Sequence, residues 1–277
     1  HDEEEVFDHD WGRYLSLAAM PDGSPALSYY DGTKTGLGFA LGTLREEEDG
    51  TKAWKWSHEE VDGYADETGL DTGDRGLYTS MAIAADGTAW VGYQDVTNGS
   101  LRYASRTSDG SWSTGIADVG GGTTPQSGAF ASLALDASGS PVIAHYDQAE
   151  GELRVAHFQG SSFSGEVVDE GSDVQVGGDT GEDAEFIGAD VGQFVSLTIS
   201  GGVEYMAYYD AAAGALKLAF GSSGAYSIET IDDEGDVGAW PDIEVVNGTI
   251  HITYQDLENE DLLYVSGEPG AWNFEEI

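Results

Sequence analysis

The sequence contains five copies of one pattern, and this internal repeat constrains the fold more than any other feature. Each copy opens with a glycine, an aromatic residue two positions later, and then a Ser or Asp that precedes an aliphatic residue. The opening motifs are Gly12-Tyr14-Ser16-Leu17, Gly76-Tyr78-Ser80-Met81, Gly128-Phe130-Ser132-Leu133, Gly192-Phe194-Ser196-Leu197 and Gly238-Trp240-Asp242-Ile243. A second run ends in Asp31, Asp95, Asp147, Asp210 or Asp256, and a Leu follows each of these six residues later.

Each copy predicts four short strands, because its segments are rich in aromatic, β-branched and small residues and are separated by turn residues. The fourth segment begins with an aromatic that we expect in the core: Trp56, Trp112, Phe163, Tyr226 or Trp272. Four-stranded antiparallel meanders repeated radially make a β-propeller. The sequence therefore predicts an all-β, five-bladed β-propeller in a single domain, residues 1–277, with blades at 12–62, 76–118, 128–169, 192–232 and 238–277 and essentially no helix.

Closure of the ring is a separate question, because an open ring leaves unpaired surfaces. The fifth copy has its own fourth segment at 272–277, so closure does not require a strand from the N-terminus. Residues 3–8 resemble the end of an outer strand, as at 229–232. We therefore expect the N-terminal segment, residues 1–11, to pair with or lie beside the last blade.

The repeats resemble those of secreted bacterial β-propeller proteins, including many from myxobacteria and marine bacteria. The shared pattern is G-x-Y-x-S-L-A-x-D-x-x-G-x-P-x-I-x-Y-Y-D, which residues 128–147 match best. The resemblance covers nearly the whole chain and implies the fold. It implies little about activity, because those families are mostly uncharacterised and propellers include binding modules, hydrolases and lyases.

The charge and composition exclude several classes of function. The chain has 52 Asp and Glu against 10 Lys and Arg, for a net charge of −42, so it would repel nucleic acid and anionic membranes. It has no cysteine, which excludes disulfides and thiol chemistry, and no apolar run long enough to span a bilayer. The start at His1 leads us to expect a processed, secreted or cell-surface protein, and the diffuse acidity suggests adaptation to salt.

Acidic residues in the loops are candidate metal ligands. Asp10, Asp74, Asp190 and Asp236 each stand two residues before the repeat glycine, with Gln126 in the third copy, and Asp71 and Asp179 begin Asp-Thr-Gly-acid segments in two long loops. Convergent carboxylates suit Ca²⁺, which prefers six to eight oxygen ligands. The alternative is structural, namely solvated loops and turn caps. The repeat residues Asp31, Asp95, Asp147, Asp210 and Asp256 are predicted to cap turns.

Three other residues are candidates for ligand contact. Trp11 adjoins Asp10 in a loop, Asp242 replaces the Ser of the other four copies, and His145 replaces the Tyr found at the same place in the second strand of the others. A histidine satisfied within the packed sheet is the alternative for His145.

The leading functional hypothesis is a secreted, non-catalytic, lectin-like propeller that binds an extracellular glycan or small ligand on its acidic loops, with calcium as a candidate cofactor. A glycoside hydrolase or polysaccharide lyase with axial carboxylates, such as Asp242, is one alternative, and a structural or adhesive module is another. No catalytic motif of the common hydrolase, nucleotide or zinc classes is present, which favours binding over catalysis without excluding an enzyme. The sequence leaves the oligomeric state open.

Overall fold

The computed structural model describes residues 10–64, 72–124, 126–177 and 185–277, and the regular structure in these ranges is all β-strand. Five four-stranded antiparallel sheets follow one another along the chain. Their strands are β1 (Trp11–Ala19), β2 (Pro25–Asp31), β3 (Gly36–Glu46) and β4 (Lys52–Asp62) in sheet 1; β5 (Arg75–Ile83), β6 (Ala89–Asp95), β7 (Ser100–Arg106) and β8 (Trp112–Asp118) in sheet 2; β9 (Ser127–Leu135), β10 (Pro141–Asp147), β11 (Glu152–Phe158) and β12 (Phe163–Asp169) in sheet 3; β15 (Val191–Ser200), β16 (Val203–Asp210), β17 (Ala215–Ser222) and β18 (Ala225–Asp232) in sheet 4; and β19 (Val237–Val246), β20 (Thr249–Asp256), β21 (Asp261–Glu268) and β22 (Ala271–Glu276) in sheet 5.

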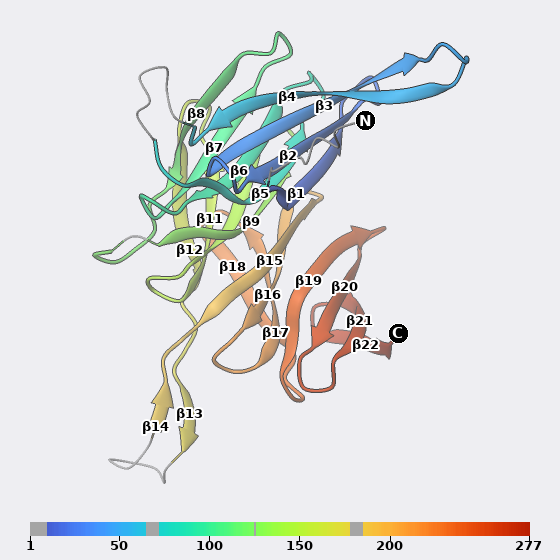
Figure 1. The fold of residues 1–277 in the computed structure, drawn as a ribbon. Coiled ribbons are helices and arrows are strands. Elements are labelled where there is room, and N and C mark those ends of the chain that lie inside the picture. Colours follow the sequence, from blue (N-terminus) through green and yellow to red (C-terminus); the bar gives the residue numbers. More distant parts are fainter. Residues whose placement is uncertain (1–9, 65–71, 125, 178–184) are drawn as a thin grey trace, which may run out of the picture.

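Each sheet is a meander whose strands pair in chain order, and the first strands lie innermost, where β1, β5, β9, β15 and β19 contact one another in turn (Figure 1). The sheets begin one residue before the predicted blade starts. A separate hairpin, β13 (Val174–Gly177) with β14 (Glu185–Ile187), projects between sheets 3 and 4 at the bottom of Figure 1. The described part of the chain contains no helix that is long and apolar enough to cross a membrane.

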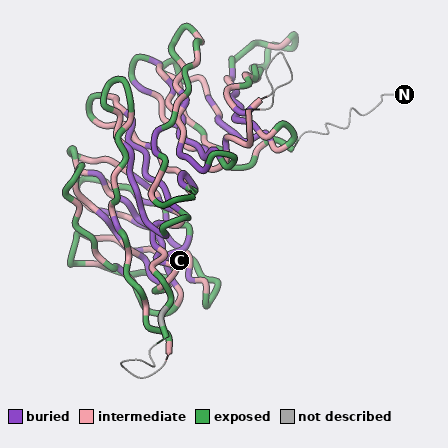
Figure 2. Tube along the Cα trace, turned by 90° about the vertical axis from the view of Figure 1, so that its left-hand side faces the viewer, coloured by how far each residue is buried: buried purple, intermediate pink, exposed green. Residues whose placement is uncertain are grey.

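The core lies between neighbouring sheets, and the buried segments run through the interior strands while the hairpin tips are exposed (Figure 2). One contact recurs at the four interfaces between successive sheets: the repeat glycine of one sheet packs on the backbone of the repeat leucine of the sheet before it. A Cβ added at Gly76, Gly128, Gly192 or Gly238 would lie 2.8, 2.8, 2.8 or 2.6 Å from the Cα of Leu37, Leu101, Leu153 or Leu216. Only glycine permits this approach.

The repeat serine makes a second recurring contact, in which its Oγ accepts the N–H of the next sheet's aliphatic residue. Met81 N lies 2.9 Å from Ser16 Oγ, and the next two sheets repeat the bond at 3.0 Å, Leu133 N to Ser80 Oγ and Leu197 N to Ser132 Oγ. The fourth interface has Ile243 N at 3.3 Å from Ser196 Oγ. Because these bonds satisfy buried backbone donors, they hold the sheets in one register.

A third contact ties the outer strand of each sheet to the second strand of the next. The hydroxyls of Tyr93, Tyr208 and Tyr254 donate to Asp62, Asp169 and Asp232 at 2.5, 2.6 and 2.6 Å. Basic side chains join two of these pairs: Arg75 and Arg102 lie on Asp62, and Lys217 lies on Asp169. Burial and the nearby carboxylate raise the pKa values of Tyr93 and Tyr208 well above 10, so these tyrosines stay protonated donors.

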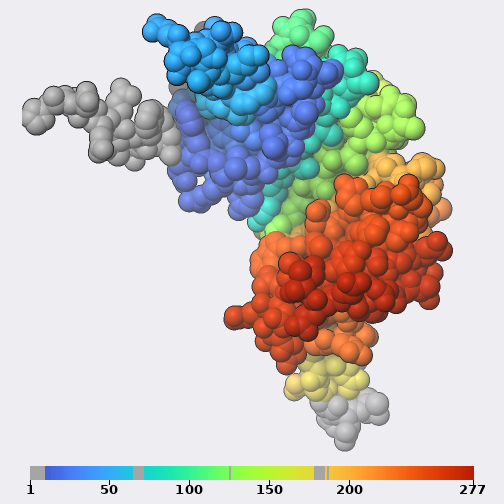
Figure 3. Space-filling view, turned by 90° about the vertical axis from the view of Figure 1, so that its right-hand side faces the viewer, coloured from blue at the N-terminus to red at the C-terminus, as the bar shows by residue number. Residues whose placement is uncertain are grey.

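The predicted closed ring is not what the structure shows. Sheet 1 contacts sheet 2, and the series continues to sheet 5, but among the described residues sheets 5 and 1 make no comparable contact. Figure 3 shows sheet 1 (blue) and sheet 5 (orange to red) as separate masses, with parts of sheets 2 and 3 visible between them. Each of the four interfaces fixes the rotation between two successive sheets. The four rotations together do not bring sheet 5 back to sheet 1, so the array stays open.

Two further predictions are modified. Trp11 belongs to β1 rather than to a terminal segment, and residues 1–9 lie outside the described residues. Trp112, Phe163, Tyr226 and Trp272 are partly buried as expected. Trp56 is 41% exposed, because no sheet packs in front of sheet 1.

Candidate functional site: an axial aromatic arc

The aromatic residues of the five opening motifs come together along the inner edge of the sheets. We call Tyr14, Tyr78, Phe130, Phe194 and Trp240 the axial aromatic arc. Each ring contacts the next, with centroid separations of 4.5, 4.7, 4.6 and 4.6 Å in chain order. The rings are tilted to one another by 37–56°, and their centroid separations lie within the 4.5–7 Å range of favourable aromatic pairs.

A repeated β-bulge explains how the sequence directs these side chains inward. The repeat glycines have φ of 97–108°, and the five aromatics have φ of 46–57°, a region that bulky residues rarely adopt. In sheet 3, Ala129 pairs with Tyr146 and Ser132 with Ala144, so two residues, Phe130 and Ala131, oppose the single residue His145. An extra residue of this kind bends the strand and re-aims a side chain.

The arc lines an open hollow of about 590 Å³. Its ends are the most accessible parts, since Trp240 is 58% exposed and Tyr14 is 39% exposed. Every described residue of the lining is aromatic, aliphatic, Thr or Pro, and none is Asp or Glu. Burial and the neighbouring Tyr14 raise the pKa of Tyr78 to about 12, so the Tyr78 phenol carries no charge near neutral pH.

Three tyrosines border the arc and connect it to the predicted metal ligands. Tyr30, Tyr146 and Tyr209 lie 6.4, 6.1 and 6.2 Å from the rings of Tyr14, Phe130 and Phe194. Their hydroxyls donate to Asp74, Asp190 and Asp236, respectively, the first two at 2.8 and 2.6 Å. In sheet 2, Gln94 takes the place of the tyrosine, and Gln126 stands where the others have Asp. Partly buried carboxylates therefore lie one tyrosine side chain away from the arc at three of the interfaces between sheets.

The candidate metal ligands are spread around the arc rather than brought together. Asp10 forms an exposed ion pair with Arg13 at 2.9 Å, while Asp74, Asp190 and Asp236 sit at three different interfaces. Asp71 and Asp179 lie outside the described residues. Within the described ranges, no group of three or more His, Asp or Glu could hold a metal ion. Calcium binding stays a prediction.

The repeat Asp residues of the second strands cap turns, as predicted. Each accepts a backbone N–H two or three residues ahead, at 2.9–3.0 Å in the closest pair: Asp31 from Thr33, Asp95 from Asn98, Asp147 from Ala149, Asp210 from Ala213 and Asp256 from Glu258.

His145 is fully buried and lies away from the hollow. Gly128 N–H donates to Nδ1 at 3.2 Å, so the ring proton is on Nε2, which donates to Asp118 at 3.2 Å. His145 thus replaces the tyrosine of the other sheets in the contact with the preceding outer strand. Burial opposes ionisation of Asp118, but hydrogen bonds from His145 and Arg154 outweigh it and hold the pKa of Asp118 well below 3.8. This arrangement favours the structural interpretation of His145.

The other two ligand candidates lie in the first strands of sheets 1 and 5. Trp11 lies 5.2 Å from the ring of His58 and 6.0 Å from that of Tyr29. Together with Trp56 and Leu27 they line an apolar groove of about 290 Å³. Asp242 is exposed, and its carboxylate accepts a hydrogen bond from Ser196 at 3.3 Å. Neither residue lines the hollow of the arc.

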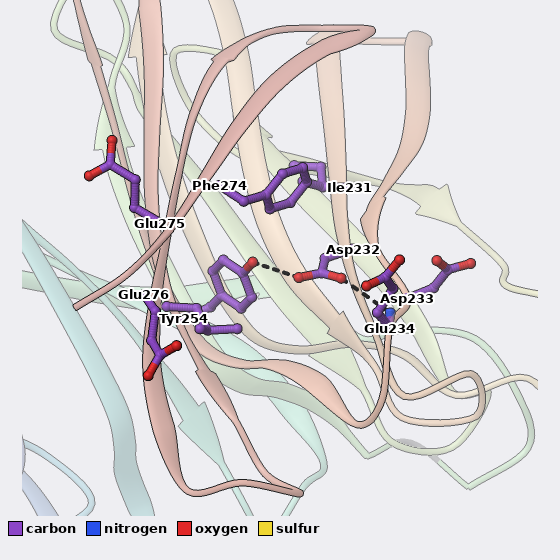
Figure 4. Close-up of a pocket in the computed structure, with 9 residues that line it drawn as sticks. Ile231, Asp232, Asp233, Glu234, Tyr254, Phe274, Glu275 and Glu276 are labelled. Atoms are coloured by element: carbon purple, nitrogen blue, oxygen red, sulfur yellow. Dashed lines mark hydrogen bonds between the residues drawn. The ribbon is translucent and has the colours of Figure 1, made fainter.

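A second cleft, of about 520 Å³, lies between β18 and β22. Its carboxylates do not converge: Glu275 and Glu276 point away from Asp233 and Glu234, and Asp232 is held by Tyr254 (Figure 4). The cleft therefore lacks the arrangement of a metal or acid–base site.

Sequence reasoning missed the axial aromatic arc as a site. The signal was present, because the aromatic recurs at one position of every opening motif, directly after the glycine that allows a bulge. It was used there only to define the repeat.

Comparison with solved structures agrees with the propeller architecture. A microbial sialidase, Hadza Hz136, matches with a TM-score of 0.56 and 13% identity over 95% of this chain and 57% of that chain. A fucose-specific lectin from Aleuria aurantia matches with a TM-score of 0.53 and 14% identity over 98% of this chain and 79% of that chain. The likeness shows the fold. A bifunctional GH43-CE protein of Bacteroides eggerthii matches at a TM-score of 0.48, with this chain spanning 34% of its length.

This chain thus spans from about a third to about four fifths of the length of these three structures. No protein-family model matches the sequence, and no curated protein does.

Proposed function

We propose that the protein binds carbohydrate without transforming it, and that the axial aromatic arc is the binding surface. The observation that carries the proposal is the continuous row of five aromatic rings lining an accessible hollow. Sugar rings present apolar C–H faces that pack on aromatic faces, and binding sites combine such apolar walls with a few placed polar groups.

The carboxylates beyond the arc supply polar groups. Asp74, Asp190 and Asp236 each accept one tyrosine hydroxyl, and both oxygens of Asp190 also accept the side-chain amide of Gln193. Asp74 and Asp236 retain the more free lone pairs, because a carboxylate offers about four acceptor sites. Sugar hydroxyls are donors that these oxygens can accept. Apolar contact in the hollow and hydrogen bonds at its edge together suit a saccharide better than a purely apolar ligand.

The backbone strain of the arc also supports a functional role. Each bulky residue at positive φ costs about 1–3 kcal/mol, and such strain is commonly retained at ligand sites. Here it is retained at five equivalent positions. Two structural neighbours with TM-scores above 0.5 are, by their names, a sialidase and a fucose-specific lectin, which supports a carbohydrate ligand.

The lining of the hollow favours binding over hydrolysis. Most glycosidases need two carboxyl groups about 5–9.5 Å apart across the scissile bond. No described residue of the hollow is Asp or Glu, and Asp242 lies outside it. The proposal retains the expectation of an extracellular location.

The test is a glycan array followed by calorimetry, with and without Ca²⁺. Trp240→Asn removes a ring of the arc while keeping a residue that tolerates positive φ. Trp54→Asn on β4 is the matched control, since Trp54 is 41% exposed but lies outside the hollow.

We expect saturable binding that Trp240→Asn weakens about 2- to 13-fold, the equivalent of about 0.5–1.5 kcal/mol for one aromatic contact, and that Trp54→Asn leaves unchanged. Absence of saturable binding to any glycan, or equal effects of the two substitutions, refutes the proposal. Release of reducing ends from a bound glycan would instead identify a hydrolase.

A further inference from the structure

The free surfaces of sheets 1 and 5 are the two halves of the interface that recurs between the other sheets. Sheet 1 has no preceding sheet to contact its repeat glycine, its Leu17 N–H and its Trp56. Sheet 5 has no following sheet to contact its repeat leucine, Leu262, or its Tyr264. Among the described residues, the contacts that recur between successive sheets are missing at this one place.

The glycine–leucine contact is absent on both sides. A Cβ added at Gly12 would meet no described atom within 4 Å, whereas the equivalent glycines of the other sheets pack on a leucine backbone. Leu262, the repeat leucine of sheet 5, is 50% exposed, while its four counterparts, Leu37, Leu101, Leu153 and Leu216, are 0% exposed.

The backbone hydrogen bond is also absent. Leu17 is 68% exposed, whereas its counterparts Met81, Leu133, Leu197 and Ile243 are 2–8% exposed and donate their N–H to the serine of the preceding sheet. On sheet 5 the serine position is Asp242, whose carboxylate is a stronger acceptor for such an N–H.

An aromatic contact is absent as well. Trp112 packs on Phe39 of sheet 1 at 5.2 Å, and Phe163 packs on Tyr103 of sheet 2 at 4.8 Å. The corresponding pair would be Trp56 with Tyr264. In the structure Trp56 is 41% exposed in the groove of sheet 1, and Tyr264 stacks on His251 of its own sheet.

We propose that a second copy of this chain covers these surfaces, with sheet 5 of one copy packed on sheet 1 of the other. Gly12 would then lie on the partner's Leu262, Leu17 N–H would donate to the partner's Asp242, and Trp56 would pack on the partner's Tyr264. The contact continues an interface already built four times in the molecule. It leaves the four internal interfaces as they are, whereas contact between sheets 1 and 5 of the same chain requires them to change.

The recurring interface selects a head-to-tail pairing, because it always joins the following face of one sheet to the preceding face of the next. Charge disfavours one alternative. Sheet 1 carries nine acids and five of the ten basic residues of the chain, namely Arg13, Lys34, Arg45, Lys52 and Lys55, while sheet 5 carries nine acids and no Lys or Arg. Two copies of sheet 5 would therefore repel each other more strongly than sheet 5 and sheet 1 do. Such a contact is heterologous, so it leads to a ring or a chain of copies rather than to a two-fold dimer.

The test measures association by sedimentation over a range of protein concentrations, at about 0.15 M and about 1 M salt, because salt screens the repulsion between two strongly acidic chains. Gly12→Ala places a methyl group in the proposed contact. Gly23→Ala is the matched control, since both glycines have positive φ, 101° and 83°, and a Cβ at either one meets no described atom within 4 Å of its own chain. We expect Gly12→Ala to weaken association at least tenfold and Gly23→Ala to have no comparable effect.

Cysteine pairs identify which chain supplies the contact, because the chain has no native cysteine. Leu17→Cys and Asp242→Cys are made as separate variants, mixed and oxidised, and the two substitutions are also combined in one chain. We expect a disulfide heterodimer from the mixture that forms in higher yield than either homodimer. A monomer at all concentrations and both salt conditions overturns the proposal, and so does a combined variant that forms its disulfide within one chain, which would show that the ring closes on itself.

Discussion

Replacement of Gly128 by alanine tests whether the glycine–leucine contact holds the sheets together. Gly128 has φ of +97°, and a Cβ at this position would lie 2.8 Å from the Leu101 Cα and 3.0 Å from its nitrogen, both backbone atoms. Alanine costs about 1–2 kcal/mol for the left-handed conformation and about 1–3 kcal/mol for the overpacking. The sum is a loss of about 2–5 kcal/mol in the free energy of unfolding.

The control is Gly139→Ala, in the first turn of the same sheet. Gly139 has φ of +80°, and its added Cβ would meet only the Ala84 Cβ at 3.9 Å, an ordinary contact. It carries the conformational cost without the clash. The two variants should therefore differ by about 1–3 kcal/mol.

Urea unfolding followed by tryptophan fluorescence, with thermal melting as a second measurement, gives both values. At about 2–4 °C per kcal/mol for a protein of this size, Gly128→Ala should lower the Tm by about 4–20 °C. If Gly128→Ala and Gly139→Ala destabilise the protein equally, close packing of the sheets on the glycines is not what stabilises the array.

Three further predictions concern charge. Asp62, Asp118 and Asp169 have pKa values below 3.8 in the folded protein, because hydrogen bonds and cations outweigh their burial. The stability they contribute is therefore present above about pH 4 and is lost as the pH falls below it. Asp118→Asn should lose about 1.5–3 kcal/mol of unfolding free energy, and its acid unfolding must depend less on pH than that of the wild type. Burial opposes protonation of His157, but Glu204 raises its pKa above 6.5, so the stability it contributes is present below pH 6.5 and declines as the pH rises through the folded pKa; a nuclear magnetic resonance titration that gives a pKa of 6.5 or lower contradicts this assignment. The net charge of −42 should make the Tm rise between about 0.1 M and about 1 M NaCl, as the Debye length falls from about 10 Å to about 3 Å, and an unchanged Tm in scanning calorimetry would show that self-repulsion is unimportant.

Four of the ten basic residues form ion pairs with an Asp of the neighbouring sheet. Arg75, Arg102, Arg154 and Lys217 have side chains only 10–15% exposed, and each pairs with an outer-strand Asp between two sheets. These four residues therefore neutralise carboxylates inside the array rather than on its surface.

The strand pattern could be predicted from the sequence because it depends on local spacing. Glycine-containing turns and runs of β-forming residues define hairpins within each copy, and the repeat aligns the copies. The turn-capping role of the repeat Asp residues followed from the same local chemistry. The sequence left both a ligand role and a structural role open for His145, because its partners, Asp118 and Gly128, are 27 and 17 residues away along the chain.

The amino-acid sequence by itself determined the number of sheets and the order of their strands, since both follow from the spacing within each copy and from the number of copies. The tertiary structure decided two features that no single copy encodes. The five bulges bring Tyr14, Tyr78, Phe130, Phe194 and Trp240 into one arc, because only the stacked sheets place equivalent positions side by side. The array stays open between sheets 5 and 1, because its curvature is the sum of small rotations at four interfaces, and that sum is a property of the whole assembly.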